Sequence, residues 1–379
     1  MAPAPPALLL WLAGAALWAA LCLPAALATA AHSQRTCEAF EKCVPLSDCK
    51  SLLRLVTHKD RKPSEHEKAL LRGAQCGWSP TSAFMPLVCC DLVPWGRCGE
   101  VPGALRDAAN GPANEGEFPW MARLLYRGPA DRADGADGAE LLHYEGCAAS
   151  LISDRYLLTA ASCVTARDNP PAYVRLGELD APEDPACVAN SSDCSSTAFN
   201  VAVQDVVVHP EYAVGAAGHQ HDIALVRLKT AVRYSEHVAP VCLPITDPLG
   251  DTLKKDRPLT VLGWGSLHRA NTNTTRRLTK SVLREVPHEF CTEKYRETPD
   301  HVDGVHQLCG RGLAEGSDAC HGDRGAPLSS TSVRQGAVLT ILEGVASFGT
   351  VSCATDGMPA VFARVATYLP WIMTSIKVA

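Results

Sequence analysis

Three short segments of the chain hold residue types that could take part in peptide-bond hydrolysis. They are LTAASC at 158–163, HQHDIALV at 219–226 and CHGDRGAPL at 320–328. Such hydrolysis needs a hydroxyl nucleophile, an imidazole that takes its proton and a carboxylate that orients the imidazole. The first segment offers a hydroxyl at Ser162, and the second offers a carboxylate at Asp222. The third holds Arg324, whose guanidinium stays protonated and cannot act as a base.

The first thirty residues indicate a secretory route. They are apolar and end in Ala28-Thr29-Ala30, a small-residue cleavage pattern, so we expect a signal peptide at 1–30. A retained membrane anchor is the alternative, and no later run approaches the ~20 apolar residues needed to span a bilayer. The formal net charge of -6 gives no electrostatic support for a nucleic-acid partner. We expect a secreted protein with no membrane partner after signal cleavage.

Cysteines and sequons agree with an oxidising compartment. Removing Cys22 with the signal peptide takes the 17 cysteines to 16, an even number that suits disulfide pairing. Asn190 and Asn273 each begin an Asn-x-Ser/Thr sequence and are expected glycosylation sites. No cofactor and no metal site are predicted. The acidic run LGELDAPEDPAC at 176–187 suits a surface loop better than a calcium site, which needs six or more oxygen ligands.

The remaining chain has two parts that differ in composition and sequence pattern. Six cysteines lie between Cys37 and Cys90, in a segment too short to bury a large core, so disulfides would supply its stability. The absence of paired C-x-x-C spacing argues against the alternative of zinc binding, and the spacing alone selects no disulfide pattern. From about Phe118, short β-type runs separated by turn residues predict an all-β barrel or sandwich. The final VATYLPWIMTSIKVA predicts a helix.

Ordered landmarks from Pro112 to the C-terminus resemble the chymotrypsin-like serine protease family. They are GEFPW at 116–120, CAASLISDRYLLTAASC at 147–163, DIALVRL at 222–228, APVCLP at 239–244, GWG at 263–265, the segment at 320–328, SFG at 347–349 and PAVFARV at 359–365. The N-terminal cysteines resemble a clip domain, a disulfide module of arthropod extracellular proteases marked by adjacent fifth and sixth cysteines. The resemblance implies a clip domain at 37–90, a linker at 91–106, and a chymotrypsin-like double β-barrel with a C-terminal helix at 107–379.

The resemblance also implies the disulfide pairing. The pairs are Cys37–Cys89, Cys43–Cys76, Cys49–Cys90, Cys98–Cys242, Cys147–Cys163, Cys187–Cys194, Cys291–Cys309 and Cys320–Cys353. Every mature cysteine then has a partner. The Cys98–Cys242 pair would tether the linker to the protease-like domain.

Two of the three catalytic groups of the family are missing. Ser162 stands where the family has its histidine, Arg324 stands where it has its nucleophilic serine, and Asp222 alone matches. Loss of a triad member costs a related enzyme on the order of 10⁴ to 10⁶ in turnover, so we expect a pseudoenzyme. His219, His221 and His321 lie nearby in the sequence, but a rescued site needs a nucleophile and a base together.

Remnants of a specificity pocket and an oxyanion hole can also be matched to the family. The matching positions are Asp318 at the pocket floor, Gly322 in the oxyanion hole, Asp323 as partner of a new terminus, Gly349 in the pocket wall, and Ala360 in place of a glycine. The methyl group of Ala360 would narrow the slot. We expect Arg324 to pair with Asp318 or Asp222 and close the cleft.

Activation by cleavage is a separate question. Counting back from GEFPW places the family's cleavage position between Arg106 and Asp107. The new terminus would be acidic and small, without the apolar side chains that seat the family's terminus in its pocket. Arg106 is either a trypsin-type cleavage site or an ordinary exposed arginine.

The closest resemblance in these features is to the non-catalytic clip-domain serine protease homologs of arthropods. It implies a secreted haemolymph protein that regulates an immune protease cascade, typically one that activates prophenoloxidase for melanisation. Other clip-domain proteases or homologs, and prophenoloxidase itself, are the expected partners. The alternatives are an active trypsin-like endopeptidase, a microbial-surface recognition protein and a negative regulator.

Overall fold

A computed structural model describes most of the chain after the expected signal peptide. The described residues are 35–38, 40–49, 52–53, 56–57, 62–79, 85–94, 98–101, 110–128, 142–165, 169–180, 197–213, 219–245, 258–264, 277–298, 300–312, 324–334, 337–349 and 358–377. The chain divides near Cys89 into two compact units, with Glu38–Lys42 grouped with the second. Within the described ranges, no helix combines the length and the apolar character that crossing a membrane requires.

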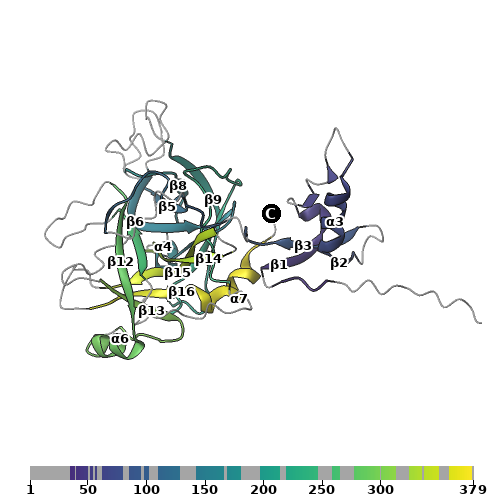
Figure 1. Cartoon of the computed structure of the whole chain (residues 1–379). Coiled ribbons are helices and arrows are strands. Elements are labelled where there is room, and N and C mark those ends of the chain that lie inside the picture. Colours follow the sequence, from purple (N-terminus) through teal and green to yellow (C-terminus); the bar gives the residue numbers. More distant parts are fainter. Residues whose placement is uncertain are drawn as a thin grey trace, which may run out of the picture. The chain divides into compact units, whose positions relative to one another are not determined.

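The described part of the N-terminal unit contains a small sheet and short helical segments (Figure 1). Its strand order is β1-β3-β2, from Glu41–Pro45, Pro86–Asp91 and Gln75–Trp78. A 3-10 helix η1 (Leu46–Asp48) follows β1, and helix α3 (Glu65–Ala74) precedes β2. A capping box begins α3, because Ser64 Oγ accepts from the Glu67 N–H while the Glu67 carboxylate accepts from the Ser64 N–H.

Disulfides hold this unit together. Cys37 is bonded to Cys89 and Cys43 to Cys76, the pairs that the resemblance implies. Cys49 and Cys90 are each disulfide-bonded as well. A disulfide sulfur is not a thiolate, so these six cysteines do not form the zinc site that was the alternative.

The second unit begins with a closed six-stranded barrel. Its order is β10-β7-β6-β5-β8-β9, and antiparallel pairing of β9 with β10 closes it. The strands are β5 (Met121–Arg127), β6 (Leu142–Leu151), β7 (Tyr156–Thr159), β8 (Tyr173–Leu176), β9 (Phe199–Val208) and β10 (Ala224–Leu228). Closure pairs every strand on both sides, so the barrel has no open edge.

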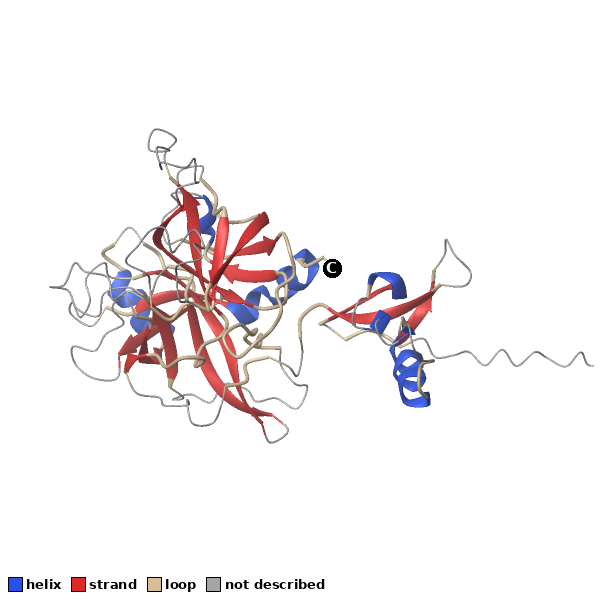
Figure 2. Cartoon of the chain, turned by 90° about the horizontal axis from the view of Figure 1, so that it is seen from above, coloured by secondary structure: helices blue, strands red, loops and turns tan. Residues whose placement is uncertain are grey.

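A second ring of strands follows in the same unit. The order is β11-β14-β15-β16-β13-β12, with β11 also paired to β12, and the short β4 (Gly111–Pro112) lies beside β12. The strands are β11 (Leu259–Gly263), β12 (Thr279–Val286), β13 (Gln307–Gly312), β14 (Pro327–Arg334), β15 (Ala337–Phe348) and β16 (Ala360–Arg364). The helices are α4 (Ala161–Thr165), α6 (His288–Tyr295) and α7 (Val365–Ser375). Figure 2 shows that strands dominate this unit, so the predicted double barrel with a C-terminal helix is confirmed.

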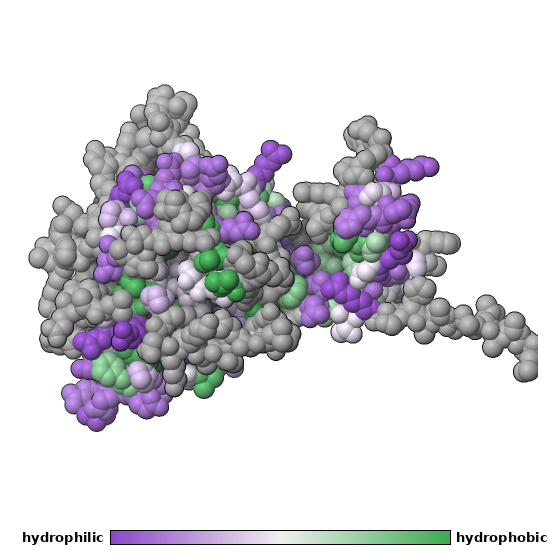
Figure 3. All heavy atoms as spheres, in the orientation of Figure 1, coloured by the Kyte–Doolittle hydropathy of each residue, from purple (hydrophilic) through white to green (hydrophobic). Residues whose placement is uncertain are grey.

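The surface and the interior of the described part differ sharply in hydropathy. On the face shown in Figure 3, hydrophilic side chains predominate and hydrophobic ones appear in small separate groups. The exposed large hydrophobic residues are Leu70, Trp78, Tyr234, Val305 and Val333.

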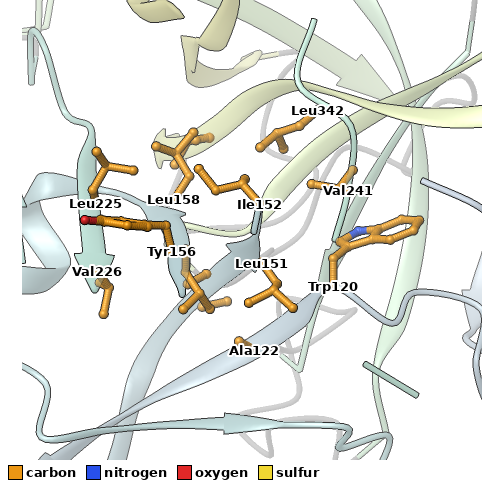
Figure 4. Packing of buried hydrophobic residues seen from close by; sticks show 14 of the residues in the cluster. Trp120, Ala122, Leu151, Ile152, Tyr156, Leu158, Leu225, Val226, Val241 and Leu342 are labelled. Atoms are coloured by element: carbon orange, nitrogen blue, oxygen red, sulfur yellow. The ribbon is translucent and has the colours of Figure 1, made fainter. Parts of the chain in front are cut away.

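One hydrophobic core joins the two barrels. Trp120, Leu158 and Leu225 of the first barrel belong to the same cluster as Leu342 of β15, which lies in the second barrel (Figure 4). All four are completely or almost completely buried. The two barrels are therefore joined by a closely packed, rigid interior.

Buried ion pairs reinforce this junction. Lys280 of β12 donates to the Glu117 carboxylate at 2.5 Å, with side-chain exposures of 5% and 3%. Asn114 also donates to that carboxylate through its backbone and its side-chain amide. The segment before β5 is in this way fastened to the second barrel.

We expect Lys280→Met to destabilise the second unit by about 3–5 kcal/mol, because it leaves Glu117 buried without its cation. The control is Arg296→Ala. Arg296 and Glu293 lie 3.0 Å apart but are 65% and 62% exposed, and such a pair contributes about 1 kcal/mol or less. Denaturant unfolding of both variants measures the difference. Equal midpoints for the two variants would contradict the special role of the buried pair.

Candidate functional site

The candidate site lies where the ends of several elements from both barrels meet. Ser162 is in α4, directly after β7, and Asp222 stands two residues before β10. Arg324 stands three residues before β14, and Ser347 is the last but one residue of β15. The structure brings Ser162, Asp222 and Ser347 into direct contact.

Asp222 is the centre of this contact. Its side chain is almost fully buried, and its Oδ1 accepts from the backbone N–H of Ser162 at 2.7 Å. Its Oδ2 accepts from the hydroxyl groups of Ser162 at 3.1 Å and Ser347 at 2.6 Å. Burying a carboxylate is costly unless donors compensate it, and here three neutral donors do so.

The backbone on the N-terminal side of Asp222 is strained. His219 and His221 have φ angles of 43° and 55°, in the left-handed region that non-glycine residues rarely adopt. The N–H of Ile223 donates to the carbonyl of His221 at 2.7 Å, which makes a tight turn around Asp222. Such strain persists only where surrounding contacts hold it, and here it fixes the direction of the carboxylate.

Ser162 has no imidazole partner among the described residues. Among the described histidines, His219 packs its ring against Phe348, and His221 hydrogen-bonds Tyr368 through Nδ1 at 3.2 Å. Neither of these two rings contacts Ser162 by a hydrogen bond within the described structure, and His321 lies outside it. The only acceptor that the Ser162 hydroxyl meets here is the Asp222 carboxylate.

Arg324 has a fixed backbone and an exposed side chain. Its N–H donates to the Gly146 carbonyl at 3.1 Å, and its carbonyl accepts from the Ala148 N–H at 2.8 Å. The predicted pairing with Asp222 is wrong, because Arg324 forms no ion pair with any described residue and the Asp222 oxygens are taken by serines. An exposed guanidinium keeps its hydration, which burial beside Asp222 would remove. Asp318 lies outside the described residues.

The positive charge of Arg324 acts electrostatically on Tyr212, which lies near Asp222. Burial raises the pKa of the Tyr212 hydroxyl, and the Asp222 carboxylate raises it further. A hydrogen bond with Thr165 and the positive charge of Arg324 act in the opposite direction and lower that pKa. Arg324 therefore presents a cation at the edge of the site without neutralising its buried carboxylate.

The turn that carries Arg324 requires glycine next to it. Gly325 has a φ of 81°, and a Cβ there would lie 2.3 Å from both the Ala148 carbonyl oxygen and the Thr159 Oγ1. Cys147, which pairs with Arg324 in an isolated β-bridge, is disulfide-bonded to Cys163. The disulfide thus links the turn of Arg324 to the helix of Ser162.

Only part of the predicted pocket is visible. Gly349 and Ala360 adjoin, because a Cβ built on Gly349 would lie 3.4 Å from the Ala360 Cβ. Gly322 and Asp323, like the pocket-floor aspartate, lie outside the described residues. Narrowing of the slot by Ala360 stays a prediction.

Sequence reasoning missed the role of Ser347. The sequence predicts no contact between Ser347 and Asp222, but Ser347 is 5% exposed and directs its hydroxyl to that carboxylate. The pairing register of β15 with β16 shifts between Ala346 and Phe348, so simple strand alternation does not predict this direction. The sequence also did not indicate a group of histidines that lies beside His221.

The connector between the units is clamped onto the second barrel. Cys98 is disulfide-bonded to Cys242, as the resemblance implies. The Gly99 N–H donates to the Pro240 carbonyl and the Gly99 carbonyl accepts from Thr340, each at 2.8 Å. Gly99 has a φ of 64°, and a Cβ there would meet the Thr340 carbonyl oxygen at 2.2 Å.

The chain is held again soon after the predicted cleavage position. Arg106 and Asp107 lie outside the described residues, but Asn110 Oδ1 accepts from the Val282 N–H at 2.7 Å. β4 then pairs with β12 through Gly111 and Pro112. Cleavage at the predicted position would therefore fall between two anchored segments.

The remaining predicted disulfides, the glycosylation sites and the acidic run lie only partly within the described residues. Cys291 is bonded to Cys309, whereas Cys187–Cys194, Cys320–Cys353, Asn190 and Asn273 lie outside the described residues. In the acidic run, Glu178 accepts from Arg123 at 2.8 Å and Arg175 at 2.6 Å, and Asp180 lies 3.4 Å from Arg277. These two carboxylates are engaged by arginines, which disfavours their use as calcium ligands.

Comparison with known proteins gives the family background of this geometry. Residues 109–372 match the family model described as Trypsin, and residues 42–90 match the one described as Regulatory CLIP domain of proteinases. The chain is 30% identical to melanization protease 1 of Drosophila melanogaster, covering 88% of this chain and 90% of that protein. It is also 30% identical to phenoloxidase-activating factor 1 of Holotrichia diomphalia, over 89% and 91% of the two chains.

A solved structure agrees at the level of the fold. The Drosophila Grass clip serine protease of the Toll pathway aligns with a TM-score of 0.57 and 24% identity. The alignment covers 88% of this chain and 93% of that one. The likeness extends over nearly the full length of both proteins.

Removing one donor tests the network around Asp222. We expect Ser347→Ala to destabilise the second unit by about 1–3 kcal/mol, because it leaves a buried carboxylate oxygen with one donor fewer. Thr374→Ala is the control, since Thr374 is exposed and its hydroxyl bonds only carbonyls of its own helix. Thermal and denaturant unfolding report the change. A Ser347→Ala midpoint equal to that of the control would show that the hydroxyl is dispensable.

Proposed function

The chain belongs to the trypsin family and carries a CLIP domain, and on this premise we propose that it is a non-catalytic member that acts by binding in an extracellular protease cascade. The observation that carries the proposal is the occupation of the Asp222 carboxylate by the hydroxyl groups of Ser162 and Ser347. In a working triad that carboxylate orients an imidazole. Here the same carboxylate is satisfied without one.

The chemistry of the remaining groups supports inactivity. A serine hydroxyl is a weak nucleophile unless a base takes its proton, and a carboxylate is far too weak a base to do so alone. Ser162 is also 8% exposed, with its hydroxyl turned toward Asp222. At the nucleophile position, Arg324 offers a permanent cation. Among the described residues, neither Ser162 nor Arg324 is hydrogen-bonded to an imidazole that could act as its general base.

The scaffold that once surrounded such a site remains suitable for binding. Closed barrels, a shared core and disulfides keep the loops on rigid supports, and loops on a rigid support commonly carry recognition. The clamp at Cys98 and Gly99 would keep the N-terminal unit attached after a cut at Arg106. Cleavage would then alter the connector without releasing either part.

The names of the relatives direct the proposal to melanisation. Melanization protease 1 and phenoloxidase-activating factor 1 each align with most of this chain. We infer a role in the cascade that activates prophenoloxidase in haemolymph, with other clip-domain proteases or homologs, and prophenoloxidase, as partners. A cofactor and a negative regulator share this framework, and the functional assay separates them.

Microbial-surface recognition finds less support. Binding of carbohydrate surfaces commonly uses grouped exposed aromatic rings. The large hydrophobic residues exposed in the described structure include only two aromatic ones, Trp78 of the first unit and Tyr234 of the second. These do not form a platform.

Direct measurement of hydrolysis tests the pseudoenzyme assignment. We expect the purified protein, before and after cleavage by trypsin, to hydrolyse Lys and Arg peptide substrates no faster than buffer. Loss of triad members reduces turnover by on the order of 10⁴ to 10⁶. The control is Asp222→Ala, which should match the unaltered protein. Hydrolysis that disappears in Asp222→Ala would overturn the assignment.

Reconstitution tests the role in the cascade. Prophenoloxidase and its activating clip-domain protease are incubated with the protein, and phenoloxidase activity is measured. We expect a several-fold increase with the intact protein and a loss of that increase with Arg106→Ala. Arg296→Ala, a change at an exposed arginine far from the linker in sequence, is the matched control. A decrease would identify a negative regulator, and no effect from any form would remove the melanisation role.

A further inference from the structure

Metal-ligating side chains gather beside Asp222, outside the network just described. His209 follows β9, and His221 precedes Asp222, so both come from the first barrel. Their rings stack at 4.9 Å between centroids with an interplanar angle of 9°. His306, just before β13 of the second barrel, places its ring 4.8 Å from that of His221. All three rings pack around Tyr368 of α7.

A carboxylate completes this group. Glu211 Oε2 lies 3.7 Å from His221 Nε2. Ligand atoms of His209, Glu211 and His221 all lie within 4.8 Å of one another. We propose that these three residues bind a divalent transition metal ion of the zinc type, with His306 as the fourth ligand. We call the four residues His209, Glu211, His221 and His306 the histidine cluster.

The donor set fits zinc. Two imidazoles and one carboxylate are a donor set found in zinc proteins, with metal–ligand bonds of about 2.0–2.2 Å. Tetrahedral geometry then separates the donor atoms by roughly 3.4 Å. The Glu211–His221 pair, at 3.7 Å, is already close to this value. The ligand atoms of His209, Glu211 and His221, which lie within 4.8 Å of one another, need to approach by at most about 1.4 Å. Imidazole donors select Zn²⁺ and its neighbours over Ca²⁺ and Mg²⁺.

The residues behind the rings suit metal binding. His306 Nδ1 lies 2.5 Å from Asp303 Oδ2, which leaves Nε2 of that ring available. A carboxylate behind a ligating histidine is a common arrangement that orients the ring and raises its basicity. His221 Nδ1 lies 3.2 Å from the Tyr368 hydroxyl, whose oxygen can accept a hydrogen bond from Nδ1–H when Nε2 binds an ion.

Binding requires a defined rearrangement. One ion must lie in the planes of both rings, so the parallel rings of His209 and His221 must rotate relative to each other. The Glu211 N–H donates to His209 Nδ1 at 3.3 Å, and this long hydrogen bond gives way if the ring turns. Glu211 is 69% exposed, so its carboxylate is free to approach the ion from solvent.

The position gives the ion a structural consequence. His209, Glu211 and His221 come from the first barrel, whereas His306 and Tyr368 belong to the second barrel and the C-terminal helix. A bound ion would link these parts next to the strained turn at His221. The site does not depend on the proposed role in a cascade, so the two proposals succeed or fail separately.

Zinc titration of the full-length protein tests this site. After removal of metal with a chelator and dialysis, calorimetry with Zn²⁺ should show about one ion bound per chain. Glu211→Gln and His221→Ala should weaken the affinity at least tenfold. His237→Ala is the matched control, because His237 and Glu115 form a similar pair at 3.7 Å without a third ligand. Binding should survive that change unaltered.

Two further readouts keep the test decisive. Co²⁺ in place of Zn²⁺ should give the visible absorption of tetrahedral nitrogen and oxygen coordination, and Glu211→Gln should reduce it. Glu211 is exposed, so this variant should fold even if His221→Ala does not. Absence of stoichiometric binding, or equal affinity in Glu211→Gln and the unaltered protein, would overturn the proposal. Equal binding of Ca²⁺ would overturn it as well.

Discussion

A single buried carboxylate organises the centre of this protein. Asp222 lies between two barrels that share one core, and its two oxygens receive hydrogen bonds from α4 and from β15. An uncompensated charge at this place would cost several kcal/mol, so the donors are a condition of the fold as much as of any chemistry. The substitution at position 162 retains a hydroxyl and a backbone N–H that meet this condition. Among the described residues, serine hydroxyls and a backbone N–H satisfy the carboxylate without an imidazole.

Much of this architecture could be predicted from the sequence. Short apolar runs predicted an all-β barrel or sandwich, and the family resemblance implied the double barrel, the clip region and the Cys98–Cys242 tether. Side-chain direction could not be predicted in the same way. The expected contact of Arg324 with Asp222 was wrong because hydration of an exposed guanidinium competes with burial. The histidine cluster combines residues from three distant segments, and their proximity emerges only when the barrels are closed.

The structural constraints around Arg324 act on its main chain and leave its side chain unconstrained. Gly325 has the left-handed conformation that its turn demands, and the Cys147–Cys163 disulfide holds the neighbouring segments. These constraints act on the main chain, so they tolerate an arginine where its side chain points to solvent. An arginine at position 324 is therefore compatible with the main-chain framework around it.

The clamp at Cys98 also sets a physical limit on the N-terminal unit. The chain from Cys89, where the N-terminal unit ends, to Cys98 spans 9 residue steps, so covalent geometry alone keeps these two points within about 32 Å. For a partner that has bound one unit, a linker of this length can raise the effective concentration of the other unit to about the millimolar range. Two weak contacts would then act together as one strong one, and this advantage would outlast a cut further along the linker.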